Sequence, residues 1–130
     1  MQSGMLRKEE SFDFGIAEAA IEQGFMPDTL STDIQKRYAG HKPPHDMPYL
    51  ISKLIASGMP ELEALDRSTK RPAQALNMDT EIGSLEPGKC ADLVLIKWNS
   101  ENRIMDDCFG SSRLGGYFEP VMTVRGGTVV

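Results

Sequence analysis

The sequence contains few of the residues on which several protein classes depend. Cysteine occurs only twice, at Cys90 and Cys108, without a CxxC spacing. This excludes a disulfide-rich scaffold and favours reduced thiols in a cytoplasmic protein. No apolar run approaches the length of a transmembrane helix, and the first ten residues, MQSGMLRKEE, lack the apolar core of a signal peptide. We therefore expect a cytoplasmic protein with no membrane partner.

Concentrated positive charge is also lacking. Lysine and arginine together number 14 against 19 acidic residues, and no basic run is longer than two residues. A net charge of -5 argues against binding to nucleic acid. The composition is 40% hydrophobic and 25% charged, which is ordinary for a globular protein. A chain of 130 residues can bury a core of its own.

The segment with the clearest chemical potential is Met26 to Asp33, MPDTLSTD. Its leucine and threonines favour an extended backbone and predict a short buried strand over 28–32, with Asp33 at the carboxyl end. In a parallel α/β barrel this end faces the active site, so a carboxylate there can hold a metal or take a proton. The alternative is a turn or helix cap, because Ser31, Thr32 and Asp33 are all residue types that bond to nearby backbone N–H groups.

Helix signals lie on both sides of this segment. Ser11 or Asp13 can cap a helix over Phe14 to Gln23, with Gly24 as its stop. An αβ repeat of this kind is the unit of α/β architecture. Further on, Asp46 can cap a second helix that continues to Gly58.

The apolar positions of this second helix recur at helical spacing and place Lys53 on its polar side. After Pro60, the interior Pro72 predicts two shorter helices, about Glu61 to Thr69 and about Pro72 to Leu76, with a bend near Lys70-Arg71. The expected buried stripe of these helices consists of Leu62, Leu65, Ala73, Ala75 and Leu76.

Between these helices, residues 35–48 contain three prolines and one glycine and indicate a loop. His41 and His45 are four residues apart, but Pro43 and Pro44 between them oppose a helix that would bring the two imidazoles together. The alternative to a metal-binding pair is a solvated loop, or histidines that contact the ligands of a site without binding the metal themselves.

The second half of the chain is predicted to be rich in β-structure. Ala91 to Trp98 and Pro120 to Arg125 have the pattern of strands, and Gly126-Gly127 has that of a hairpin turn before residues 128–130. The polar stretch 99–116 between them predicts a long connection.

Four segments resemble, in order, the C-terminal end of the amidohydrolase superfamily, and especially its dihydroorotase-like deacetylases: SFDFGIAEAAIEQGFMPDTLSTD, DMPYLISKLIASGMPELEALDRSTKRPAQALNM, EIGSLEPGKCADLVLIKW and PVMTVRGGTVV. Asp33, a TxxPA motif at Thr69 to Ala73 and a GSLEPGKxADLV motif at Gly83 to Val94 carry the match. The resemblance implies an α/β fold in which residues 1–78 are the last βα units of a metal-dependent TIM barrel. Residues 79–130 would be part of a small β-sandwich, and the barrel would be incomplete.

The resemblance also implies a site. In the complete enzyme Asp33 would be a ligand of a divalent metal, zinc in our expectation, and the proton-transfer group in hydrolysis of a small-molecule amide or cyclic amide. Tyr38 and His41 are weaker candidates for substrate contacts, with a solvated loop as the alternative. The family's HxH pair, its bridging carboxylated lysine and its two further histidine ligands lie upstream of the matched region.

We therefore expect the isolated chain to bind no metal and to be inactive. The alternative is a truncated or split-enzyme subunit that is not catalytic itself and acts by association with another chain. Barrel and sandwich strands need neighbours, so we expect self-association or pairing with a missing N-terminal barrel portion. Partial order in residues 1–46 is the other possible outcome.

Overall fold

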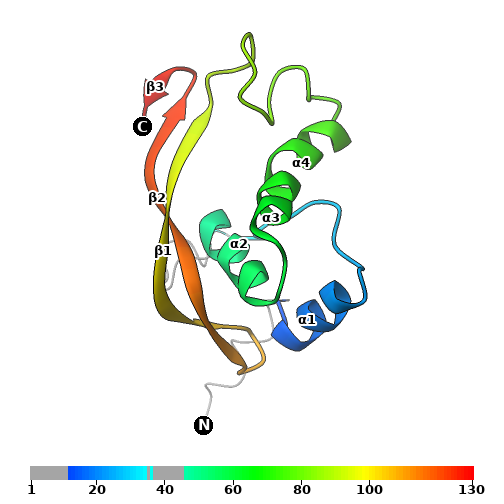
Figure 1. The fold of residues 1–130 in the computed structure, drawn as a ribbon. Coiled ribbons are helices and arrows are strands. Elements are labelled where there is room, and N and C mark those ends of the chain that lie inside the picture. The colour runs from blue at the N-terminus through cyan, green and yellow to red at the C-terminus, as the bar shows by residue number, and fades with distance from the viewer. Residues whose placement is uncertain (1–11, 35, 37–45) are drawn as a thin grey trace.

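The computed structural model describes residues 12–34, 36 and 46–130. Within these ranges the helices lie to one side of a long twisted β-hairpin (Figure 1). The elements are α1 (Phe14–Glu22), α2 (Met47–Ala56), α3 (Glu61–Ser68), α4 (Lys70–Ala75), β1 (Leu93–Asp106), β2 (Ser112–Arg125) and β3 (Thr128–Val129). The result is a mixed α/β structure with a small antiparallel sheet in the order β1-β2-β3. No helix in the described ranges is long and apolar enough to cross a membrane.

Side-chain caps begin the first two helices, as the sequence predicts. The Asp13 carboxylate accepts the N–H of Ile16 at the start of α1, and the Asp46 carboxylate accepts the N–H of Tyr49 at 3.0 Å in α2. Each cap supplies an acceptor to an N–H that has no partner within its helix. Gly24 follows α1 with a φ of 75°, a left-handed conformation suited to glycine.

The bend between α3 and α4 lies at Thr69, one residue before the predicted position. Thr69 has φ -128° and ψ -77°, outside helical values. Pro72, which lacks an N–H to continue the hydrogen-bond ladder, is the third residue of α4. The predicted buried stripe is wrong at Leu62, Ala75 and Leu76, which are all exposed.

The reason is the orientation of α3, which buries the face that carries Ala64 and Arg67. Leu62 is two residues from Ala64, so it points to the opposite side of the helix.

Residues 99–116 do not form a long connection. They complete β1, turn at 107–111 and begin β2, with pairs such as Arg103 to Gly115 and Ile104 to Leu114. Their polar composition misled the prediction because an antiparallel hairpin with a solvated face accepts polar residues. The predicted turn at Gly126-Gly127 is confirmed, with φ of 56° and 82° and β3 paired to β2. Positive φ at both residues is the hairpin type that glycine favours.

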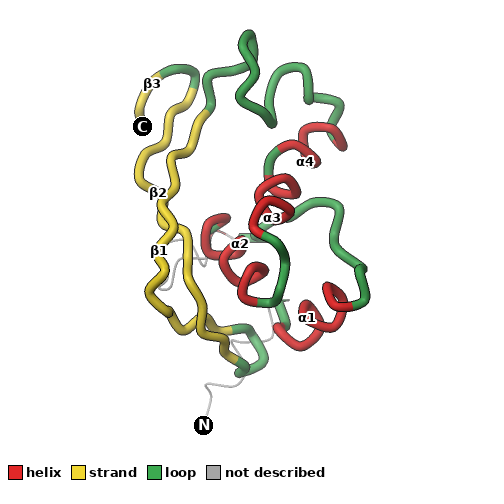
Figure 2. Tube along the Cα trace, in the orientation of Figure 1, coloured by secondary structure: helices red, strands yellow, loops and turns green. Residues whose placement is uncertain are grey.

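The main core lies where α2 packs between the hairpin and α3 (Figure 2). Its buried residues are Ile51, Leu54, Met59, Ala64 and Phe118. A second cluster of Phe14, Tyr49 and Met105 joins α1, α2 and β1.

The position of Lys53 on α2 differs from the prediction. It is buried, with Nζ 4.7 Å from the centre of the Tyr49 ring and 5.2 Å from that of Phe12. Aromatic faces attract a cation, and neighbouring elements cover both sides of α2. The prediction that Lys53 lies on the polar side of the helix is therefore wrong, because it assumed that one side of α2 faces solvent.

Candidate functional site

The segment Met26 to Asp33 is not a strand in this structure. Residues 28 and 29 form a bend, and residues 30–34 follow without ladder pairing. The N–H of Leu30 donates instead to the carbonyl of Arg67 in α3, at 2.9 Å. A short barrel strand requires parallel neighbours, and the described part of the chain places none beside this segment. The predicted strand over 28–32 is therefore corrected to an irregular segment held by α3.

Asp33 lies in a turn built by its neighbours, as the alternative interpretation anticipated. The hydroxyl of Ser31 accepts the N–H of Asp33 at 3.5 Å, and that of Thr32 accepts the N–H of Ile34 at 3.3 Å. Asp33 has a φ of 48°, in the left-handed region, and its residue surface is exposed. Aspartate tolerates this conformation better than most residues, and backbone outliers of this kind cluster at functional sites.

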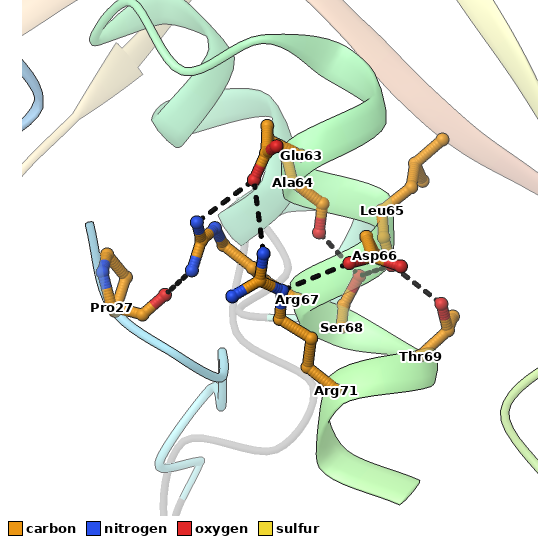
Figure 3. Close-up of polar contacts among 9 residues, drawn as sticks. All are labelled: Pro27, Glu63, Ala64, Leu65, Asp66, Arg67, Ser68, Thr69 and Arg71. Atoms are coloured by element: carbon orange, nitrogen blue, oxygen red, sulfur yellow. Dashed lines mark hydrogen bonds and ion pairs between the residues drawn. The ribbon is translucent and has the colours of Figure 1, made fainter. Parts of the chain in front are cut away.

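Arg67 fixes this segment to α3 (Figure 3). Its guanidinium donates through Nη1 to the carbonyl of Pro27. Its own main-chain carbonyl accepts the N–H of Leu30. The Met26 and Leu30 side chains pack at the edge of the main core. Since Arg67 belongs to the last turn of α3, its carbonyl has no partner further along that helix. The helix end thus supplies an acceptor for the segment.

Two acidic and two basic side chains surround this attachment. Arg67 Nη2 lies 2.9 Å from Glu63 Oε2, and Arg71 reaches the same carboxylate at 3.8 Å (Figure 3). Arg71 also donates to Asp66 at 3.0 Å. The charge of the buried Arg67 guanidinium is therefore balanced one helical turn away.

The two motifs of the resemblance form one packed unit. Gly83, at the start of the second motif, lies against Ala73 and the carbonyl of Thr69 in the first. A Cβ at Gly83 would be 2.6 Å from the Cβ of Ala73. Lys89 orders the rest of the loop, because its ammonium bonds to the hydroxyl of Ser84 at 2.6 Å.

Sequence reasoning missed Arg67 and Glu63. The only signal was their spacing of four residues, which is common on exposed helices and says nothing of a distant segment. Tyr38 and His41, the proposed substrate contacts, and His45 lie outside the described residues.

A cavity of about 320 Å³ is present elsewhere, lined by Asp46, Tyr49, Arg103, Tyr117, Phe118, Glu119, Pro120 and Val121. The Arg103 guanidinium lies 5.6 Å from the ring centre of Tyr49 and 5.1 Å from that of Tyr117. Asp33 does not line this cavity. The structure therefore does not bring the cavity and the candidate carboxylate together.

The described residues do not by themselves form a metal centre. Among them, no group of three His, Cys, Asp or Glu side chains comes close enough to hold an ion. A single exposed carboxylate such as Asp33 does not fit a zinc site, which takes three or four protein ligands.

Comparison with known proteins identifies the family. The model of the amidohydrolase family matches residues 13–130. A deacetylase of Enterococcus faecalis is 32% identical over 121 residues, which are 92% of this chain and 32% of that protein. A deacetylase of Agrobacterium fabrum is 33% identical over 124 residues, 92% of this chain and 29% of its own length.

Two solved structures share the fold. The crystal structure of an adenine deaminase superposes with a TM-score of 0.84 at 32% identity, over 92% of this chain and 33% of the other. That of a dihydroorotase gives 0.80 at 31% identity, over 92% and 32%. This chain thus spans about a third of the length of each of these four relatives. Both the sequence and the fold place the chain in the amidohydrolase family.

Proposed function

We propose that these residues form the C-terminal part of a metal-dependent amidohydrolase that hydrolyses the C–N bond of an amide or cyclic amide. Support comes from the family match and from relatives named deacetylase and dihydroorotase. Under this proposal α1 to α4 belong to the last βα units of an incomplete barrel within residues 1–78. The sheet of residues 79–130 would be part of a small β-sandwich.

The observation that carries the proposal is the Asp33 turn. Asp33 is exposed and has a left-handed backbone, and it belongs to a segment that is tied to α3 at Pro27 and Leu30. In hydrolysis, Asp33 in its ionised form would take a proton from the attacking water. It would then give that proton to the leaving nitrogen, acting first as general base and then as general acid.

A role for Asp33 as a metal ligand requires further ligands from outside the described residues. We therefore propose that the chain of 130 residues, by itself, is inactive. The second candidate function is that of a non-catalytic subunit that acts by association. The exposed apolar side chains Leu93, Leu95 and Met122 of the sheet favour it, because they present a surface that a partner can cover.

The test measures hydrolysis of N-acetyl amino acids and of dihydroorotate, with zinc present. The 130-residue chain should release no product. The complete enzyme of which we propose it to be the C-terminal part should turn over one of these substrates. In that protein, Asp33→Asn should lower kcat by about 10²- to 10⁴-fold, the usual contribution of general acid–base catalysis. Asp28→Asn is the matched control, because Asp28 is also exposed in the same segment.

Two outcomes would contradict this assignment. Metal-dependent turnover by the 130-residue chain, abolished by Asp33→Asn, would show that the chain alone suffices. Equal changes of kcat in Asp33→Asn and Asp28→Asn would show that Asp33 is not the general acid–base group.

A further inference from the structure

We propose that Arg67 is a positioning residue that sets the conformation of the Asp33 turn. Its relevance to catalysis rests on the proposed function of Asp33, whereas the attachment itself can be measured without turnover. Arg67 holds Pro27 through its side chain and Leu30 through its main chain. These two contacts bracket the bend at residues 28 and 29, and Asp33 follows Leu30 by three residues. Two residues, Ser31 and Thr32, lie between the anchored Leu30 and Asp33.

The guanidinium is oriented by one hydrogen bond and one ion pair. Nη1 donates to the Pro27 carbonyl and Nη2 lies 2.9 Å from Glu63 Oε2, while Nε has no hydrogen-bond partner among the described residues. Arg67 is 8% exposed, so its charge is shielded from water and depends on Glu63. A planar fork that reaches a carbonyl with one nitrogen and a carboxylate with another is a geometry that arginine provides and lysine does not.

Arg71 offers a matched comparison within the same ionic cluster. It pairs with Glu63 and Asp66, so its removal also disturbs the charges around α3. Within the described residues, the hydrogen bond and ion pairs of Arg71 go to Glu63 and Asp66, and none goes to residues 27–34. If only the charge on α3 matters, substitution of either arginine should disturb the Asp33 turn. If Arg67 is a tether, only substitution of Arg67 should do so.

The first experiment measures the turn directly in the 130-residue chain. Amide hydrogen exchange reports the Leu30 N–H, and the ¹³Cα and ¹³Cβ chemical shifts of Asp33 report its left-handed backbone. Arg67→Gln removes the charge-assisted hydrogen bond to the Pro27 carbonyl and keeps the main-chain bond to Leu30. The loosened segment should then exchange its Leu30 N–H about tenfold faster, and the Asp33 shifts should move toward extended values. Arg67→Lys should give a smaller change, and Arg71→Gln should leave both readouts as in the wild type.

Core amides such as those of Ile51 and Leu54 show whether the fold survives in each variant. If Arg67→Gln does not fold, Arg67→Lys and Glu63→Gln provide the same comparison with milder changes. Equal responses of Leu30 and Asp33 to substitutions at Arg67 and Arg71, or no response to any of them, would overturn the proposal.

The second experiment uses the longest protein that contains these residues. Arg67→Lys should lower kcat several-fold with little change in KM, because the substrate contacts remain and the general base is misplaced. In the Asp33→Asn background the same substitution should have no further effect, since Arg67 acts through Asp33. An undiminished effect in that background would overturn positioning. If Asp33→Asn itself leaves turnover unchanged, the proposed function of Asp33 is wrong. The attachment through Arg67 is then tested by the hydrogen-exchange and chemical-shift measurements alone.

Discussion

Asp107 Oδ2 accepts the main-chain N–H of Phe14 at 3.1 Å, joining the turn between β1 and β2 to the first residue of α1, 93 positions earlier. The other oxygen of this buried carboxylate accepts the N–H groups of Phe109 and Ser111, at 2.9 and 2.8 Å. One side chain thus closes the hairpin and attaches the first helix to it. A carboxylate is suited to this position because it accepts several hydrogen bonds without a donor of its own.

Replacing Asp107 should weaken the fold in a pH-dependent way. Burial raises the pKa of Asp107, but hydrogen bonds from the N–H groups of residues 14 and 109–111 lower it and prevail. A lowered folded-state pKa gives stability that is present above the ordinary value of 3.8 and lost as the pH falls through the folded-state value. Asp107→Asn should lower the free energy of unfolding at pH 7 by about 1–3 kcal/mol.

Urea unfolding at neutral and acid pH measures both effects. The variant should lose less stability than the wild type on acidification, because it has no charge to lose at this position. Asp106→Asn, at an exposed neighbouring carboxylate, should behave as the wild type. Parallel pH profiles for the wild type and Asp107→Asn would contradict the assignment.

Gly83→Ala tests the packing between the two motifs. The new Cβ would lie 2.6 Å from the Cβ of Ala73, at a residue with a φ of 91°. Gly88 has a φ of 92° and nothing within 4 Å of the corresponding position, so Gly88→Ala measures the backbone strain alone. Thermal or urea unfolding should show a loss of about 1–2 kcal/mol for Gly88→Ala and about 1–3 kcal/mol more for Gly83→Ala. Equal losses would mean that the contact with Ala73 adds nothing.

Substitutions at Asp33 should separate conformation from chemistry. Asparagine tolerates the left-handed region as aspartate does, so Asp33→Asn should leave the free energy of unfolding within about 0.5 kcal/mol of the wild type. Alanine does not, and Asp33→Ala should cost about 1 kcal/mol at a φ of 48°. Asn77, with a φ of 55°, provides a second left-handed residue at which Asn77→Ala should show a similar loss. A stable Asp33→Ala variant would show that the turn is not held in this conformation in solution.

The sheet should promote self-association. Leu93, Leu95, Met122 and Val129 are exposed by 43%, 54%, 41% and 62%, and the strand register places them on one face. β1 is also an edge strand of the sheet, so its outer backbone groups can pair with another chain. Sedimentation at micromolar concentration should show dimers or larger species, and Leu95→Lys should weaken them. Leu85→Lys, at a residue outside the strands that is 83% exposed, is the control. A wild-type monomer throughout the concentration range would contradict this.

Sequence reasoning succeeded where the signal was local. The caps at Asp13 and Asp46 and the turn at Gly126-Gly127 depend on residues within four positions of one another, and the structure has all three. It failed where the decisive partner is distant. Lys53 is buried because aromatic rings from two segments face it, which no helical periodicity records.

The candidate site shows the same division. The strand predicted over 28–32 was wrong, whereas the turn formed by Ser31 and Thr32 was one of two interpretations left open. Its attachment through Arg67 could not be predicted, because an arginine on a helix gives no indication of which carbonyl it will meet.

The attachment at Arg67 also has a consequence for the order of events during synthesis. Pro27 and Arg67 are 40 residues apart, and the anchor is the later of the two. At common translation rates this separation corresponds to about 2–8 s during which the earlier segment has emerged without its partner. The attachment of this segment therefore forms only after Arg67 has been made, so a stall of the ribosome between these codons would leave Pro27 and Leu30 without their partner.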